Sequence, residues 1–262
     1  MWTAPKIRRL KGREKVVCLT AYDYTTARLI DACGIHLVLV GDSLGMTMLG
    51  YPTTLPVTME EMLHHTAAVA RGVERALVVA DMPFLSYQVS EKDAIRNAGR
   101  FLKEAGAAAV KIEGGAFRAP LVRTLVQNGI PVLGHIGLTP QSIRELGSYT
   151  IQGRKPREAE QLVADARALA EAGVFALVLE CVPAELGREI TRTVEVPTIG
   201  IGAGADCDGQ ILVTHDLLGL YTGKIPSFVK QYASLAETMK RAFSDYKRDV
   251  ESGAFPAEEH RF

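Results

Sequence analysis

The 262-residue chain lacks the features that mark membrane-bound and nucleic-acid-binding proteins. No apolar stretch approaches the ~20 residues that a membrane-spanning helix needs, and the basic first fifteen residues lack the apolar centre of a signal peptide. The formal net charge is +0, from 30 Lys and Arg against 30 Asp and Glu. A neutral chain has no general attraction for polyanions, so we expect no nucleic-acid partner and no membrane partner.

The chain also lacks a paired-cysteine pattern. Its four cysteines form no CxxC pair and show no metal-finger spacing: Cys18, Cys33, Cys181 and Cys207. Three of them lie in or beside apolar runs, where a small buried thiol is the usual role. This usage fits a reducing compartment, and we expect a cytoplasmic protein.

What the chain does have is a series of apolar runs that end in polar side chains. Runs of four to eight aliphatic residues are typical of strands buried on both faces of a parallel sheet. Five runs carry polar groups near their carboxyl ends: Asp42 and Ser43 in 36–46, Asp81 in 76–83, Lys111 and Glu113 in 108–114, His135 in 131–137, and Glu180 in 176–182. Because α/β folds form their pockets at this end of the strands, the pattern predicts a site there.

Eight apolar runs alternate with segments of helical pattern. We expect strands at 16–23, 36–46, 76–83, 108–114, 131–137, 176–182, 197–204 and 210–219. We expect helices at 25–34, 59–72, 90–105, 118–128, 156–172, 184–193 and from about 227 onward. This order predicts an α/β fold, a (β/α)8 TIM barrel forming a single domain over 1–262, with a short N-terminal arm and C-terminal helices. A doubly wound open sheet is the alternative, but no dinucleotide fingerprint follows the first strand.

Local signals refine three of the helices. Thr25 is a candidate N-cap for the helix over 25–34, and the spacing of Thr58 and Glu61 predicts a capping box before the helix over 59–72. In the helix over 156–172, one apolar face is expected to contain Leu162, Ala166, Leu169 and Ala170.

The acids at the ends of strands two, three and four need a cation among them. Asp42, Asp81 and Glu113 would repel one another if they converged without solvent. Lys111 is one candidate cation, because residues two apart on a strand share a face. A divalent metal is the other, and oxygen-only ligands favour Mg²⁺ over Zn²⁺. A Lys–carboxylate network without a metal is the alternative.

Two further residues are candidates for chemistry. His135 is either a hydrogen-bonded core residue or a substrate contact at the barrel mouth. Glu180 follows ALVL and precedes Cys181 and Val182, so its neighbours in sequence are apolar. Apolar surroundings raise the pKa of a carboxyl group and suit a general base.

Ten motifs in order along the chain resemble the 3-methyl-2-oxobutanoate hydroxymethyltransferase family. The most specific of them are VGDSLGMT (40–47), VKIEGG (110–115) and GHIGLTPQ (134–141), and TAYD (20–23), ADMPF (80–84) and LECVP (179–183) agree with them. One departure is Ser227, where the family pattern leads us to expect a basic residue before FVK.

The resemblance implies a (β/α)8 barrel of the phosphoenolpyruvate/pyruvate type that assembles as a homodecamer of two stacked pentamers. The implied reaction transfers a hydroxymethyl group from 5,10-methylenetetrahydrofolate to the keto acid 3-methyl-2-oxobutanoate, giving 2-dehydropantoate for pantothenate biosynthesis. Competing hypotheses are another Mg²⁺-dependent 2-keto-acid C–C lyase or phosphonomutase of the same barrel type, and a barrel without enzymatic activity.

The resemblance also implies roles for individual residues. Three acids correspond to the Mg²⁺ site, with Glu113 acting partly through water: Asp42, Asp81 and Glu113. Ser43 and Lys111 would hold the keto-acid carboxylate, Glu180 would be the catalytic base, and His135 would lie near the substrate. Asp42 and Asp81 would contact the substrate as well as the ion.

Overall fold

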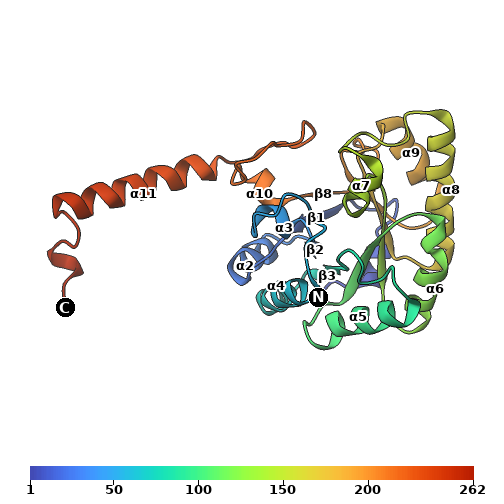
Figure 1. Ribbon diagram of the computed structural model, residues 1–262, viewed down its shortest axis with the longest axis horizontal. Coiled ribbons are helices and arrows are strands. Elements are labelled where there is room, and N and C mark those ends of the chain that lie inside the picture. The colour runs from blue at the N-terminus through green and yellow to red at the C-terminus, as the bar shows by residue number, and fades with distance from the viewer. The chain divides into compact units, whose positions relative to one another are not determined.

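Eight parallel strands close into a barrel (Figure 1). In the computed structural model, which describes residues 1–262, each strand pairs with its two sequence neighbours and β1 pairs with β8. The strands are β1 (Val16–Thr20), β2 (Leu37–Val40), β3 (Leu77–Asp81), β4 (Ala109–Glu113), β5 (Val132–Gly137), β6 (Ala176–Glu180), β7 (Thr198–Ile201) and β8 (Gly209–Leu212). The predicted (β/α)8 barrel is confirmed.

The chain divides into two compact units, Met1–Val213 and Thr214–Phe262. The first contains the barrel and the helices α1 (Ala4–Arg8), α2 (Tyr24–Ala32), α3 (Leu44–Thr47), α4 (Met59–Gly72), α5 (Glu91–Lys103), α6 (Ala119–Gln127), α7 (Ile143–Leu146), α8 (Pro156–Ala172) and α9 (Ala184–Thr193). The second contains α10 (Thr214–Leu217), α11 (Leu235–Ser252) and a short 3-10 helix.

Most predicted elements are present, but several boundaries differ. The strand predicted over 36–46 ends at Val40, because Leu44–Thr47 form α3. The capping box of α4 is confirmed, because Thr58 Oγ1 accepts from the Glu61 amide at 3.2 Å while the Glu61 carboxylate accepts from the Thr58 amide at 2.7 Å. The N-cap of α2 is Asp23 rather than Thr25, since the Asp23 carboxylate accepts from the Thr26 amide at 2.9 Å. The last strand ends at Leu212, because the residues after it form α10, and α11 begins at Leu235 rather than near 227.

The buried face of α8 differs by a small rotation from the predicted one. Val163, Ala166, Leu169 and Ala172 are buried, whereas Leu162 and Ala170 are only partly covered. The observed face follows a spacing of three residues, and a helix with 3.6 residues per turn accommodates either choice. Which stripe is buried depends on what packs against the helix, which the periodicity alone does not specify.

The pleat of each strand separates two apolar groups. Alternate residues such as Val78, Val110 and Leu177 pack outward with the buried faces of the helices. The residues between them, such as Leu77, Leu133 and Val178, form a second cluster on the inner face of the barrel. Because strand side chains alternate between faces, each strand contributes to both layers.

Helix α1 belongs to the inner cluster and so covers the amino-terminal end of the barrel. Ile7 is fully buried and packs with strand residues such as Cys18 and Leu37. Just beyond the helix, Lys11 Nζ pairs with Asp208 Oδ2 at 2.8 Å, and the same oxygen accepts from the Thr198 amide at 2.9 Å. This end of the barrel is therefore closed by packing and by a partly buried ion pair.

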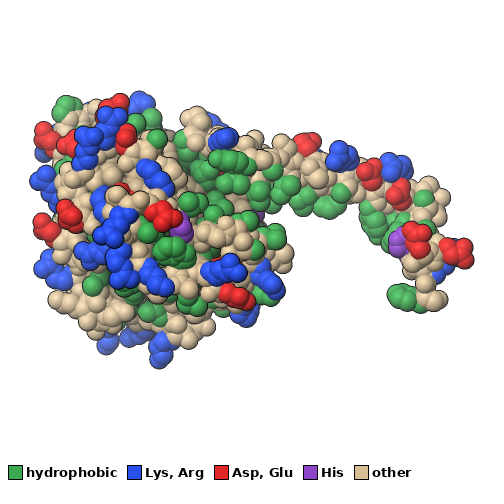
Figure 2. All heavy atoms as spheres, turned by 180° about the vertical axis from the view of Figure 1, so that it is seen from behind, with side chains coloured by type: hydrophobic (Ala, Val, Ile, Leu, Met, Phe, Trp, Pro, Cys, Tyr) green, Lys and Arg blue, Asp and Glu red, His purple; other side chains and the backbone are tan.

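The second unit carries an apolar helix face. Four large side chains of α11 are 41% to 63% exposed at a 4-3-4 spacing: Met239, Phe243, Tyr246 and Val250. Figure 2 shows hydrophobic side chains gathered along this helix. None of the helices of the chain combines the length and hydropathy that crossing a bilayer requires.

Replacing Ile7 by alanine is expected to lower the free energy of unfolding by about 2–5 kcal/mol, because it leaves a cavity between α1 and the barrel interior. Chemical denaturation measures this change. Arg8→Ala on the exposed face of the same helix is the control and should change stability by about 0.5 kcal/mol or less. An Ile7 variant as stable as the Arg8 variant would show that α1 does not seal the barrel.

Candidate active site

The polar residues predicted at the strand ends lie on the inner face of the barrel. Asp81 continues the inner series of Leu77 and Val79, and Glu180 continues that of Ala176 and Val178. The same alternation places Lys111 and Glu113 of β4 on the inner face, after Ala109, and His135 of β5 on the inner face, after Leu133. Five of the predicted residues are at most 4% exposed: Asp42, Asp81, Lys111, Glu113 and His135.

Strand register brings these side chains together. Asp81 pairs laterally with Lys111, and Glu113 with His135. Glu180 lies opposite Gly137 on the next strand. The structure therefore gathers residues that are far apart in sequence, from Asp42 to Glu180, as the strand-end argument predicts.

Lys111 is the charged centre of this group. Its Nζ lies 2.9 Å from Asp81 Oδ1, 3.4 Å from Glu113 Oε1 and 3.2 Å from His135 Nδ1. Burial by itself would lower the pKa of the ammonium group, but the charges of Asp81, Glu113 and Asp42 outweigh burial and raise the pKa of Lys111 above its ordinary value. Lys111 is therefore charged at neutral pH.

The three acids experience this cation unequally. Burial and then the charge of Asp81 raise the pKa of Asp42 well above its ordinary value. Burial also raises the pKa of Asp81, although Lys111 opposes the effect. For Glu113, burial acts in the same direction, but Lys111 and His135 outweigh it and lower its pKa. Burial and neighbouring carboxylates therefore disfavour the charged forms of the two aspartates.

His135 links this cluster to Glu180. Its Nδ1 lies 3.5 Å from Glu113 Oε1, and its Nε2 lies 3.2 Å from Glu180 Oε2. Burial and Lys111 tend to lower the pKa of the imidazole, but the two glutamates raise it to about 9. The sequence neighbours of Glu180 are apolar, whereas its spatial neighbour is the polar imidazole of His135.

Glu180 is the most accessible acid of the group. Its side chain is 18% exposed, whereas those of Asp81 and Glu113 are 2% and 3% exposed. The next residue, Cys181, has φ 49°. A positive φ is uncommon for a residue with a side chain and is found at functional sites. The chain thus turns sharply directly after Glu180.

The turn after β2 positions Asp42 and Ser43. The Asp42 amide donates to Asp81 Oδ2 at 3.3 Å, and Ser43 Oγ lies 2.8 Å from the hydroxyl of Tyr22. A side chain at Gly41 would place its Cβ 2.8 Å from Ser43 Oγ, so glycine at this position lets Ser43 Oγ stay beside Tyr22. Tyr22, in the TAYD motif, is a contact that the sequence did not predict.

Gln141 and Tyr87 are two more site residues that sequence reasoning missed. Both are buried, at 4% and 2% exposure, and their side chains are hydrogen-bonded to each other at 2.7 Å. The available signal for Gln141 was its place at the end of GHIGLTPQ. Tyr87 has no comparable signal, because it follows the ADMPF motif by three positions and lies in a loop.

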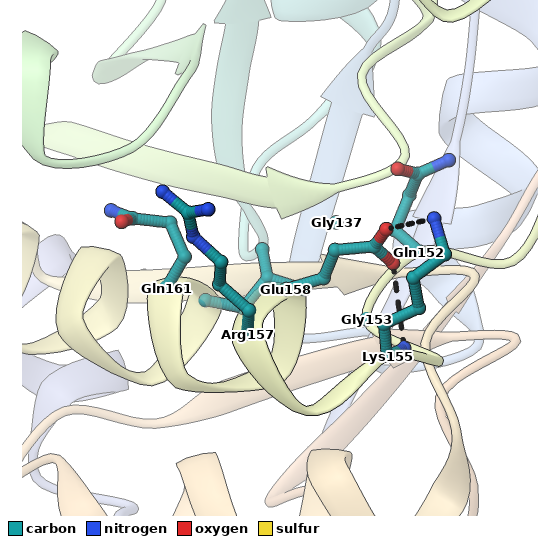
Figure 3. A pocket seen from close by; sticks show the side chains of 8 residues that line it. Gly137, Gln152, Gly153, Lys155, Arg157, Glu158 and Gln161 are labelled. Carbon is teal, nitrogen blue, oxygen red and sulfur yellow. Dashed lines mark hydrogen bonds and ion pairs between the residues drawn. The ribbon is translucent and has the colours of Figure 1, made fainter.

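A separate cavity of about 490 Å³ opens beside the end of β5 (Figure 3). It is lined by Gly137, Gln152, Gly153, Lys155, Arg157, Glu158, Gln161 and Leu162. Lys155 Nζ bonds Glu158 at 3.0 Å, so two of its charged side chains satisfy each other. The cavity shares no residue with the buried carboxylate group. It borders that group at Gly137, the lateral partner of Glu180, and at Gln152, whose amide donates to the Cys181 carbonyl at 2.8 Å.

The donor chemistry of the buried group fits a hard divalent cation held by few protein ligands. No three His, Cys, Asp or Glu side chains of the chain are arranged to hold a metal ion. One or two carboxylates completed by water and substrate are, however, the usual Mg²⁺ environment, and Asp42 and Asp81 are adjacent. Burial raises the pKa of both aspartates and neighbouring carboxylates raise it further, so a divalent cation beside them would favour their charged forms.

A closed parallel barrel with a charged group at its strand ends defines the class of (β/α)8-barrel enzymes. Solved structures with the same fold include 2,3-dimethylmalate lyase, described as a PEP mutase/isocitrate lyase superfamily member, with TM-score 0.64, 17% identity and coverage of 100% of this chain and 89% of that chain. Oxaloacetate acetylhydrolase gives TM-score 0.63 at 14% identity, covering 99% and 90%.

Sequence comparison narrows this class to one family. The family model of ketopantoate hydroxymethyltransferase matches residues 1–258. The 3-methyl-2-oxobutanoate hydroxymethyltransferase of Moorella thermoacetica is 59% identical over 99% of this chain and 97% of its own length, and that of Clostridium novyi is 57% identical over 95% and 90%. The chain belongs to the ketopantoate hydroxymethyltransferase family.

Replacing Lys111 by methionine should destabilise the fold by about 3–5 kcal/mol at pH 8 with a chelator present, because the buried acids lose their cation. The loss should shrink towards pH 5. Carboxyl groups whose pKa is raised in the folded state bind more protons there than in the unfolded chain, so stability falls as pH rises. Denaturation at both pH values, with the exposed Lys103→Met as control, tests this. A pH-independent loss would contradict it.

Proposed function

We propose that this chain transfers a hydroxymethyl group from 5,10-methylenetetrahydrofolate to 3-methyl-2-oxobutanoate, giving 2-dehydropantoate for pantothenate biosynthesis. Family membership supports the reaction. The observation that supports this site is the grouping of one buried lysine, three buried acids and one partly accessible glutamate at a single barrel mouth.

Lys111 and Ser43 are assigned to the carboxylate of the keto acid. Lys111 is charged and lies near the end of β4, opposite Asp81 of β3. Ser43 is oriented by the hydroxyl of Tyr22. A fixed ammonium and a fixed hydroxyl hold a carboxylate in one orientation. This orientation presents carbon 3 of the substrate to the base.

Glu180 is assigned as the base that removes the proton from carbon 3. It is the only acid of the group with appreciable exposure, and His135 Nε2 at 3.2 Å holds its carboxylate in place. Carbon 3 of the resulting enolate forms the new C–C bond to the methylene carbon of the folate. Both C–N bonds of that carbon break, tetrahydrofolate leaves, and one water supplies the oxygen of the new hydroxymethyl group.

Asp42 and Asp81 are assigned to a Mg²⁺ ion, with Glu113 contributing partly through water. Their adjacency and their raised pKa values support this assignment. When bound, Mg²⁺ supplies Lewis-acid polarisation of the keto oxygen. The protein residues determine where the substrate lies and which proton leaves.

Glu180→Gln should retain keto-acid binding but lose about 10²–10⁴-fold in exchange of the carbon-3 proton, the usual contribution of a positioned base. Proton NMR of 3-methyl-2-oxobutanoate in D₂O with Mg²⁺ measures this exchange before any folate is added. Glu189→Gln, an exposed residue of α9, is the matched control. Exchange at the wild-type rate in Glu180→Gln would remove Glu180 from this role.

Adding 5,10-methylenetetrahydrofolate to the same sample tests the one-carbon donor. The expected result is conversion of the keto acid to 2-dehydropantoate only when the folate is present. Cleavage of a 2-keto acid without folate would instead support a C–C lyase of the same barrel type.

We further propose a homodecamer of two stacked pentamers, working in the cytoplasm. The exposed 4-3-4 stripe of α11 supports self-association, because such a spacing is typical of helices that pack through one face. The four cysteines are free thiols, which a reducing compartment preserves.

Phe243→Glu is expected to reduce the assembly mass, because it places a charge in the middle of this stripe. Light scattering after size exclusion measures the mass. Ser244→Glu adds the same charge to an exposed face of α11 away from the stripe and should leave the assembly intact. An unchanged mass for both variants would show that the stripe is not a subunit contact.

A further inference from the structure

We infer that Gln141 is a positioning residue for the metal site, because its side-chain amide fixes the carboxylate of Asp42 in the orientation that binds the ion. The inference rests on the proposed assignment of Asp42 and Asp81 to Mg²⁺. Gln141 is assigned no contact with the substrate, because it acts through Asp42.

Gln141 joins three neighbouring strand ends. Its Nε2 donates to Asp42 Oδ2 at 2.9 Å and to the Met82 carbonyl at 2.9 Å. Its backbone amide donates to Glu113 Oε2 at 3.1 Å. One residue from the segment after β5 therefore contacts the chain at the ends of β2, β3 and β4.

The orientation of the amide is fixed by its partners. The Tyr87 hydroxyl donates to Gln141 Oε1 at 2.7 Å, and Gln88 Nε2 donates to the same oxygen at 3.3 Å. With Oε1 accepting twice, Nε2 must face the carboxylate and the carbonyl. A carboxyl side chain could not donate both bonds, so a neutral amide is required at this position.

Tyr87 is in turn held by its surroundings. Its hydroxyl accepts from the Glu113 amide at 3.2 Å, and the guanidinium of Arg118 lies 5.2 Å from the centre of its ring. A cation over an aromatic face restricts the ring. The chain of contacts from Arg118 through Tyr87 to Gln141 therefore ends on the Asp42 carboxylate.

Asp42 relies on the side-chain amide of Gln141, whereas Asp81 and Glu113 have Lys111 as a close partner. Lys111 pairs with Asp81 and Glu113 within 3.4 Å, whereas the hydrogen bond from Gln141 is the side-chain bond that Asp42 accepts. The bond engages Oδ2 and leaves Oδ1 to another partner. Hydrogen bonds to a ligating carboxylate set its direction and contribute to metal affinity.

The test is Mn²⁺ binding, measured by electron paramagnetic resonance on the full chain in its native assembly, without substrates. Gln141→Met keeps the approximate volume and the backbone bond to Glu113 but removes the amide. We expect Mn²⁺ to bind about 10- to 100-fold more weakly. Raising the Mg²⁺ concentration should restore most of kcat, because Lys111 and Glu180 are unchanged.

Tyr87→Phe is the second variant and covers the case in which Gln141→Met does not fold. It removes only the hydroxyl that orients the amide, so we expect an affinity loss of about 2- to 10-fold, as for one neutral hydrogen bond. Gln127→Met, at the exposed end of α6, is the matched control and should bind Mn²⁺ as the wild type does.

The outcomes distinguish the positioning role of Gln141 from the assignment of Asp42 and Asp81 to the metal ion. A folded Gln141→Met variant with wild-type Mn²⁺ affinity, or a Tyr87→Phe variant without any loss, would overturn the positioning role and leave the metal assignment intact. A wild-type protein that fails to bind Mn²⁺ would overturn the metal assignment and the positioning role together.

Discussion

The buried charge of Lys111 is the interaction on which the rest of the site depends. A desolvated ammonium group is costly unless it is paired, and desolvated carboxylates repel one another. Both costs are reduced when Lys111 lies within 3.4 Å of Asp81 and Glu113 inside the barrel. The pKa of Lys111 rises for the same reason. Barrel closure supplies the geometry, since the ring of strands directs several chain segments at one buried cation.

The alternation of the strands assigns opposite tasks to the two ends of the barrel. Along the inner face of β3, Leu77 and Val79 belong to the apolar cluster, and Asp81 follows at the carboxyl end. A shift of one residue in register would turn Asp81 towards the helices. The apolar cluster covered by α1 therefore fixes the register that the charged mouth requires. Stability at one end and chemistry at the other are linked through the same strands.

Much of this arrangement was predictable from the sequence, because strand periodicity is local information. The apolar runs identified all eight strands, and their polar ends identified Asp81, Glu113 and Glu180. Contacts made by side chains from distant loops were not predictable in this way. Gln141 and Tyr87 reach the site because of how two loops fold, and no local sequence pattern predicts such contacts.

Competition between local options explains the smaller differences. Both Asp23 and Thr25 can cap a helix, and the backbone entering α2 is extended at Asp23, which decides between them. For α8, the neighbouring elements select Val163 and Ala172 over Leu162 and Ala170. The surroundings of Glu180 differ for a related reason, because the residue beside it in space is His135 from another strand.

The electrostatics of the mouth connect binding of the metal ion with binding of the keto acid. Burial, followed by the charges of Asp81 and Glu113, raises the pKa of Asp42, so three acids lie close to the single ammonium group of Lys111. On the proposed function, an anionic substrate adds a further negative charge to the same volume. Bound alone, it would compete with Asp81 and Glu113 for Lys111, and a divalent cation removes that competition. Metal and keto acid should therefore increase each other's affinity by the same factor, as linkage requires.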